Sequence, residues 1–215
     1  FTYERDLQVS AWCRSVGLPW TELPQFGVVR RLKSRNTWQA RWEAHMAAPL
    51  ADLPTMHFFA PTACQGPECM QAPAGLHHHP AQRQRGGRSL AVDTLHSFLN
   101  ARALGYRGGI SSPLSSPDAC SRLSAYLAWG CISLREVVQS TRATLDALPP
   151  QATRHRAGLV GFMSRLYWHC HFIQKLESEP EIEWRNMHQG YDGLREDDWN
   201  DTHFAALTSA RTGWP

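Results

Sequence analysis

The chain has 215 residues, of which 42% are hydrophobic, and this is enough apolar material for one packed domain or for parts of two. Its net charge of +3 permits contact with nucleic acid without requiring it. No apolar stretch is long enough to span a membrane, no signal peptide is visible, and the six cysteines are scattered as in proteins with reduced thiols. We therefore expect a cytoplasmic protein that is not associated with a membrane.

The first quarter of the chain predicts two helices. Residues 3–16 carry an apolar stripe at helical spacing, and Gly17 suits the helix exit. An extended piece broken by two prolines follows, and "WQARWEAHM" predicts a second, short helix. Proline, glycine, glutamine and histidine then accumulate and the periodicity disappears, so residues 51–87 are predicted to be a linker.

The rest of the chain predicts only helices. The first spans residues 89–105, where Gly105 ends it, and a loop over 106–119 follows. The stretch "DACSRLSAYLAWG" predicts the start of a second helix that runs to about Thr144. A third covers 156–179 and is ended by Pro180, and a fourth covers 197–210 with Asp198 or Asn200 as its cap.

The start of the second of these helices is a candidate anion site. Arg122 lies between Ser121 and Ser124, at a point where backbone N–H groups are free and the helix dipole is positive. Hydroxyls and a guanidinium in that place either cap the helix or bind an anion, and this stretch alone leaves both interpretations open.

The third helix combines core residues with a second, unusual face. Leu159, Met163, Leu166, Cys170 and Ile173 fall at the spacing of a core stripe. The neighbouring stripe carries an arginine, an imidazole and several rings, which favours a flat, partly charged ligand, although an amphipathic core helix with a buried arginine is the alternative. Its members are Phe162, Arg165, Trp168 or His169, and Phe172.

A metal site is not expected. Cysteine and histidine are the usual zinc ligands, but the cysteines and histidines of the linker match no common zinc spacing. His169 and His171 are two residues apart and cannot share a metal from one helical face. The linker residues concerned are Cys64, Cys69, His77, His78 and His79.

Several motifs together resemble those of the photolyase/cryptochrome flavoproteins. "CSRLSAYLAWGCISLREV", "SRLYWHCHFIQKLE" and "RTGWP" occur in the same order and at similar separations in that family. "YERDLQVSAWCRSVG" and "FGVVRRLKSRNTWQARW" are similar to the last part of the family's antenna domain. The resemblance implies a mainly α chain: residues 1–50 as a C-terminal remnant of an α/β, Rossmann-like antenna domain, 51–87 as the interdomain linker, and 88–215 as the N-terminal part of the all-helical FAD-binding domain.

The resemblance also implies a cofactor and the residues around it. FAD is expected, with Tyr106 and the stretch from Cys120 through Ser121, Arg122 and Leu123 to Ser124 around its phosphates and ribityl chain. Phe162 and His169 would face the flavin, and Arg165 and Trp168 would meet a DNA lesion. Arg165 and His169 depart from the glutamate and arginine of the best-known repair enzymes, which weakens the expectation of dimer repair.

The implied function is a FAD-dependent, blue-light-driven DNA photolyase that passes an electron from reduced FAD to pyrimidine lesions, a carbon–carbon lyase. Damaged DNA is the expected partner, the protein is expected to be a monomer, and a second antenna chromophore of the folate or deazaflavin type is possible in the full-length protein. Trp199 is a candidate electron-transfer residue, with helix-entry packing as its alternative. Because the chain begins at Phe1 and ends at Pro215 inside a motif, we expect an internal fragment that is inactive alone and binds FAD weakly.

Two alternatives remain open at this stage. One is a non-repairing, cryptochrome-type photoreceptor on the same fold, which the residues at Arg165 and His169 favour. The other is a helical interaction module without a cofactor, in which the arginine and the rings only pack.

Overall fold

The computed structural model describes residues 2–24, 26–52, 55 and 83–213. Helices dominate these residues, and none of them forms a β-strand, which confirms the prediction of a mainly α chain. The described chain divides into two compact units, residues 22–172 and residues 1–21 with 173–215. The candidate zinc ligands from Cys64 to His79 lie outside the described residues.

The longer helices follow the predicted order. Those of the first half are α1 (Thr2–Ser15), α2 (Trp38–Ala47) and α3 (Arg88–Asn100). They are followed by α4 (Tyr106–Gly109), α5 (Ser116–Ala119), α6 (Ser124–Ala128), α7 (Leu134–Ala147), α8 (Thr153–Ser178) and α9 (Asp201–Thr208). Over the described residues, no helix is both long enough and apolar enough to cross a membrane.

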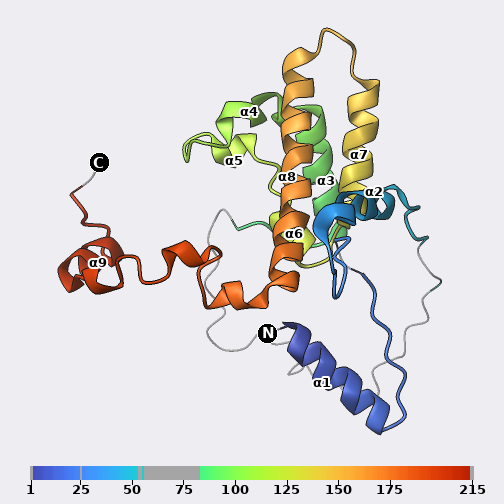
Figure 1. Cartoon of the computed structure of the whole chain (residues 1–215). Coiled ribbons are helices and arrows are strands. Elements are labelled where there is room, and N and C mark those ends of the chain that lie inside the picture. The colour runs from blue at the N-terminus through green and yellow to red at the C-terminus, as the bar shows by residue number, and fades with distance from the viewer. Residues whose placement is uncertain (1, 25, 53–54, 56–82, 214–215) are drawn as a thin grey trace, which may run out of the picture. The chain divides into compact units, whose positions relative to one another are not determined.

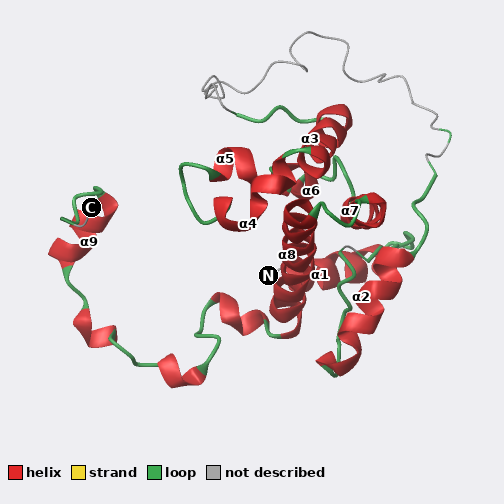
Figure 2. Ribbon diagram, turned by 90° about the horizontal axis from the view of Figure 1, so that it is seen from above, coloured by secondary structure: helices red, strands yellow, loops and turns green. Residues whose placement is uncertain are grey.

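Unit 22–172 is built around the first part of α8. Helices α3 and α7 lie alongside α8, and both views show this arrangement (Figures 1 and 2). The predicted core stripe of α8 is confirmed for Leu159, Leu166 and Cys170, which are buried, and for Met163, which packs against the same core. The fifth predicted member, Ile173, is only partly buried and does not belong to this core. The other helices contribute apolar side chains at helical spacing: Trp38, Trp42 and Met46 from α2, Ala91, Leu95, Phe98 and Leu99 from α3, and Leu134, Val137 and Val138 from α7.

Helix α8 approaches the turn after α3 so closely that a side chain is excluded at one position. A Cβ atom built on Gly158 would lie 1.9 Å from the carbonyl oxygen of Ala103. The next glycine on the helix, Gly161, is less restricted, because its Cβ would lie 3.7 Å from the Tyr106 ring. Gly158 is therefore needed for this packing.

The predicted helix that runs from the "CSRLS" stretch to Thr144 is wrong, because the chain forms two helices there. Helix α6 ends at Ala128, and Gly130 follows with a φ of 66°, a left-handed conformation that breaks a helix. Helix α7 then starts afresh at Leu134, where the Ser133 hydroxyl accepts a hydrogen bond of 3.1 Å from the backbone N–H of Glu136.

The prediction of Asn200 as a helix cap is confirmed. Asn200 is the N-cap of α9, since its side-chain oxygen accepts from the backbone N–H of His203 at 3.0 Å.

Helix α2, inside the segment predicted as an antenna remnant, packs against α7 in one unit. Nothing in the structure tests where the antenna domain ends, so the boundaries 1–50, 51–87 and 88–215 stay predictions.

Candidate functional site

The backbone of residues 120–124 turns sharply between α5 and α6. Cys120 ends α5 in an extended conformation, and Arg122 has a φ of 62°, which is unusual for a residue with a side chain. Leu123 returns to the right-handed helical region with φ −93° and ψ −10°, and α6 begins at Ser124. We call residues 120–124 the 120–124 segment.

Side chains from distant parts of unit 22–172 hold three successive carbonyl groups of this segment. The guanidinium of Arg102 donates to the carbonyl oxygens of Cys120 and Ser121, the latter at 3.2 Å. The amide of Gln84 donates to the carbonyl oxygen of Arg122 at 2.9 Å. The carbonyl side of the segment is therefore satisfied by the protein.

The N–H side of the same segment is open. Among the described residues, no acceptor is found for the backbone N–H groups of Ser121 to Ser124. A left-handed residue followed by a right-handed one, as at Arg122 and Leu123, turns successive N–H groups toward one side and makes a concavity that suits an anion. The side chains of Arg122 and Ser124 are exposed beside it.

Positive charge is concentrated at this segment. Burial lowers the pKa of Arg102 from its ordinary value, and the nearby guanidinium of Arg122 lowers it further, while Asp118 and Cys120 act in the opposite direction. Within the described part of the chain, Arg122 forms no ion pair with a carboxylate. An anion bound here would offset the repulsion between the two arginines.

Tyr106 and Phe162 belong to a buried aromatic cluster next to the 120–124 segment. The Phe162 ring lies 4.6 Å from that of Phe98 and 5.8 Å from that of Tyr106, and Phe162 is 3% exposed. Burial raises the pKa of Tyr106, and electrostatic interaction with Cys120 raises it further, whereas Arg165 lowers it. The structure thus brings Tyr106, Cys120, Phe162 and Arg165 into one neighbourhood, with the Phe162 ring covered by protein side chains.

His169 lies seven residues after Phe162 and therefore on a similar side of α8. Its ring packs edge-on against the ring of Phe26 at 5.0 Å. Although part of the side chain is exposed, burial of the imidazole lowers its pKa, so the neutral form is favoured.

Arg165, Trp168 and Phe172 form an exposed row on α8, which we call the α8 ridge. The Arg165 guanidinium lies 5.6 Å from the centre of the Trp168 ring, and the Trp168 and Phe172 rings are 5.7 Å apart. Trp168 and Phe172 are each 49% exposed. The alternative of a core helix with a buried arginine is wrong at Arg165, whose side chain is exposed.

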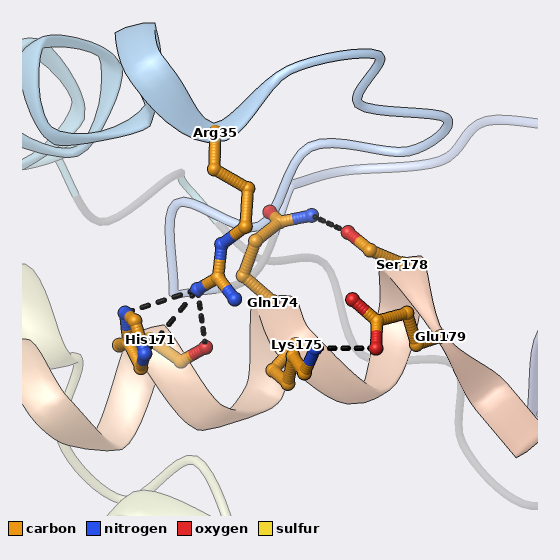
Figure 3. Close-up of polar contacts among 6 residues, drawn as sticks. All are labelled: Arg35, His171, Gln174, Lys175, Ser178 and Glu179. Atoms are coloured by element: carbon orange, nitrogen blue, oxygen red, sulfur yellow. Dashed lines mark hydrogen bonds and ion pairs between the residues drawn. The ribbon is translucent and has the colours of Figure 1, made fainter. Parts of the chain in front are cut away.

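The end of the ridge is fixed by a contact from a distant part of the sequence. One Nη atom of Arg35 lies 3.0 Å from Nδ1 of His171 and donates to the carbonyl oxygen of the same residue at 3.3 Å (Figure 3). The His171 ring in turn contacts Phe172 edge-on at 5.5 Å. Further along the helix, Gln174 donates to Ser178 at 3.1 Å and Lys175 forms an ion pair with Glu179 (Figure 3).

Trp199 lies in the other unit and is 66% exposed. Its indole N–H donates to the Asp201 carboxylate at 2.8 Å, and its ring lies 4.8 Å from that of Phe204. Trp199 and Phe204 line an open groove of about 510 Å³ together with His203 and Leu207. These contacts agree with helix-entry packing, and a role in electron transfer stays a prediction.

Sequence reasoning did not find Arg102 or Gln84. Arg102 and Gln84 reach the 120–124 segment from 18 and 38 residues away, and their contacts exist only because α3 and the residues on either side of it pack beside that segment. No motif or local spacing could have identified them.

Comparison with known proteins gives one match. Residues 162–215 match the family model described as the FAD binding domain of DNA photolyase. No curated protein and no solved structure matches the chain. The matched segment contains the α8 ridge and His169, and it supports FAD as the cofactor. Residues 162–215 are thus similar to the FAD-binding domain of DNA photolyases, in agreement with the resemblance found in the sequence.

Proposed function

We propose that the protein binds FAD and acts as a blue-light-driven DNA photolyase. The observation that carries the proposal is the 120–124 segment, where four adjacent N–H groups without acceptors among the described residues lie beside the exposed Arg122. This donor set fits the diphosphate of a dinucleotide, because successive N–H groups and a guanidinium are the groups that bind phosphate oxygens. The family match over residues 162–215 supplies independent support for FAD.

Each part of the neighbourhood has a role in this proposal. Ser121, Arg122 and Ser124 hold the phosphates, and Tyr106 orders the backbone on which they depend, because its buried ring packs against α8. The chain binds and orients the cofactor and excludes water from it. The chemistry that bound, reduced FAD would supply is the light-driven donation of an electron to a pyrimidine lesion, with return of the electron after the lesion is split.

The α8 ridge is the proposed contact with the lesion. A base that leaves the stack needs a flat aromatic surface, and Trp168 offers one that is half exposed. Arg165 lies over the Trp168 ring and adds a positive charge beside the base. Exposed aromatic surface costs free energy in water, and stacking of a base on Trp168 would cover part of that surface.

Pyrophosphate binding tests the anion site in the chain as it stands. In a titration followed by amide chemical shifts, pyrophosphate should move the signals of Ser121 to Ser124, and Arg122→Gln should weaken binding on the order of tenfold. Arg88→Gln is the matched control, because Arg88 pairs with Glu136 at the surface of the same unit. Shifts spread evenly over surface arginines, or an Arg122→Gln variant with unchanged affinity, would contradict the proposal.

Repair itself is tested with the protein in its natural form. Illumination in the presence of reduced FAD should restore intact pyrimidines in an oligonucleotide that contains a lesion, and Trp168→Ala should reduce that yield. If neither cyclobutane dimers nor (6-4) products are restored while FAD binds, the protein is instead a photoreceptor. That alternative is favoured by Arg165, which places a cation where repair enzymes of the family carry an acceptor.

A further inference from the structure

Arg102 makes more directed contacts than any other side chain near the 120–124 segment. Its Nε atom donates to the Ser97 hydroxyl at 3.1 Å, and one Nη atom donates to the Thr94 carbonyl at 2.9 Å. The same Nη atom also donates to the carbonyl oxygen of Ser121, and the second Nη atom donates to the carbonyl oxygen of Cys120. Two acceptors on α3 and two on the segment are therefore joined by one planar group.

The Arg102 guanidinium also lies over a buried aromatic ring. The Phe98 ring lies 5.5 Å from the central carbon of the Arg102 guanidinium. Phe98 is fully buried and belongs to the aromatic cluster with Tyr106 and Phe162. A guanidinium between a buried ring and four acceptors has a fixed orientation, which a lysine ammonium, as a single point charge, could not reproduce.

The orientation of the carbonyl groups determines where the N–H groups point. In a trans peptide unit the C=O and the following N–H point in opposite directions. When Arg102 holds the carbonyls of Cys120 and Ser121, the N–H groups of Ser121 and Arg122 are turned away from it. Gln84 donates to the carbonyl of Arg122, and the N–H of Leu123 in that peptide unit is therefore turned away from Gln84.

We propose that Arg102 is a positioning residue, which turns the N–H groups of the 120–124 segment toward the phosphates without touching them. This inference rests on the proposed function, since it assumes that these N–H groups bind phosphate. It predicts that geometry and not charge is what Arg102 contributes. Arg102→Lys, which keeps the charge and loses the fork, should then behave like Arg102→Gln.

Two measurements on the chain test this inference. The first is alkylation of Cys120 in the absence of any ligand, with Cys131 in the same protein as the internal reference, because both are partly buried free thiols. Cys120 should react faster in both Arg102 variants, and Cys131 should not change. The second is pyrophosphate affinity, which should fall on the order of tenfold in both variants, the same loss that is expected for Arg122→Gln.

The outcomes separate the inference from the proposed function. If the wild-type chain does not bind pyrophosphate, or if Arg122→Gln has no effect, the proposed function fails, while Cys120 alkylation still shows whether Arg102 holds the segment. If Arg122→Gln loses affinity and Arg102→Lys does not, Arg102 acts by charge or not at all, and the inference is wrong. Arg88→Lys, at the start of α3 in the same unit, should leave both measurements unchanged, and thermal unfolding identifies any variant that has lost its fold.

Discussion

Residues 22–172 and the segment after α8 have similar aromatic content but very different burial. In the first region Trp38, Trp42 and Phe98 are almost completely inaccessible. In the second, Trp184 and Trp199 are 81% and 66% exposed, and the chain from 179 to 213 forms short 3₁₀ turns and one helix of 8 residues. The comparison shows that aromatic side chains stabilise a region only where long helices bring their apolar faces together, and that elsewhere local capping determines the structure.

The largest expected effect tests the packing of the first region. Gly158→Ala should destabilise the protein by about 3 kcal/mol, because the new Cβ would meet the Ala103 carbonyl at 1.9 Å and α8 would have to move away from α3. Helix propensity alone predicts the opposite, a gain of roughly 1 kcal/mol. Urea denaturation followed by circular dichroism measures the difference.

Gly161→Ala is the matched control for this substitution. Its Cβ would make ordinary contact with the Tyr106 ring at 3.7 Å, so the variant should be as stable as the wild type or slightly more stable. Equal stability of the two variants would mean that α8 does not pack on the Ala103 turn.

Local sequence signals predict most of the long helices but not the close packing between them. The helices at α1, α2, α8 and α9 follow from periodicity and from Gly17, Pro180 and Asn200, which are local signals. The break between α6 and α7 is not predicted by the periodicity, although the Ser133–Glu136 spacing is that of a capping box. A need for glycine at position 158 could not be predicted, because it depends on how closely two helices approach.

The candidate site also contains residues that a local pattern predicts and residues that only tertiary packing brings there. Arg122 was identified because a cation between two serines at a helix start is a local pattern. Arg102 was not, since its acceptors lie 18 and 19 residues away and are brought near by tertiary packing. Phe162 was placed on a ligand-facing stripe by its spacing, whereas the structure buries its ring against Phe98, because the two stripes of α8 overlap at that position.

A second pair of variants compares capping in the two regions. Ser133→Ala removes the cap of α7, and the free energy of unfolding of the compact unit should fall by about 1 kcal/mol. Asn200→Ala removes the equivalent hydrogen bond at α9, and a similar loss should melt α9 alone, because helices of this length are marginal without packing. Hydrogen exchange resolved by residue distinguishes a global loss from a local one.

Asn200→Ser is the control for this pair, because it keeps a side-chain acceptor at the cap and should preserve α9. If Asn200→Ala lowers the unfolding midpoint of residues 22–172 as much as Ser133→Ala does, the two regions are one cooperative unit and the contrast between them is wrong.

The smallest effect is a pH dependence that belongs to the first region. Burial lowers the pKa of His45 below its ordinary value of 6.5, and Arg135, whose Nε atom donates to the His45 carbonyl at 2.7 Å, lowers it further. The unfolded chain then binds a proton more readily than the folded one, so stability should decrease as the pH falls below about 6.5 and should not depend on this group at higher pH.

His45→Gln keeps the backbone carbonyl for Arg135 and removes the titrating ring. The decrease in unfolding free energy between pH 7.5 and pH 5.5 should therefore be smaller in this variant than in the wild type. An identical decrease in both proteins would place the pH dependence on other groups and would mean that His45 can be protonated in the folded state without cost.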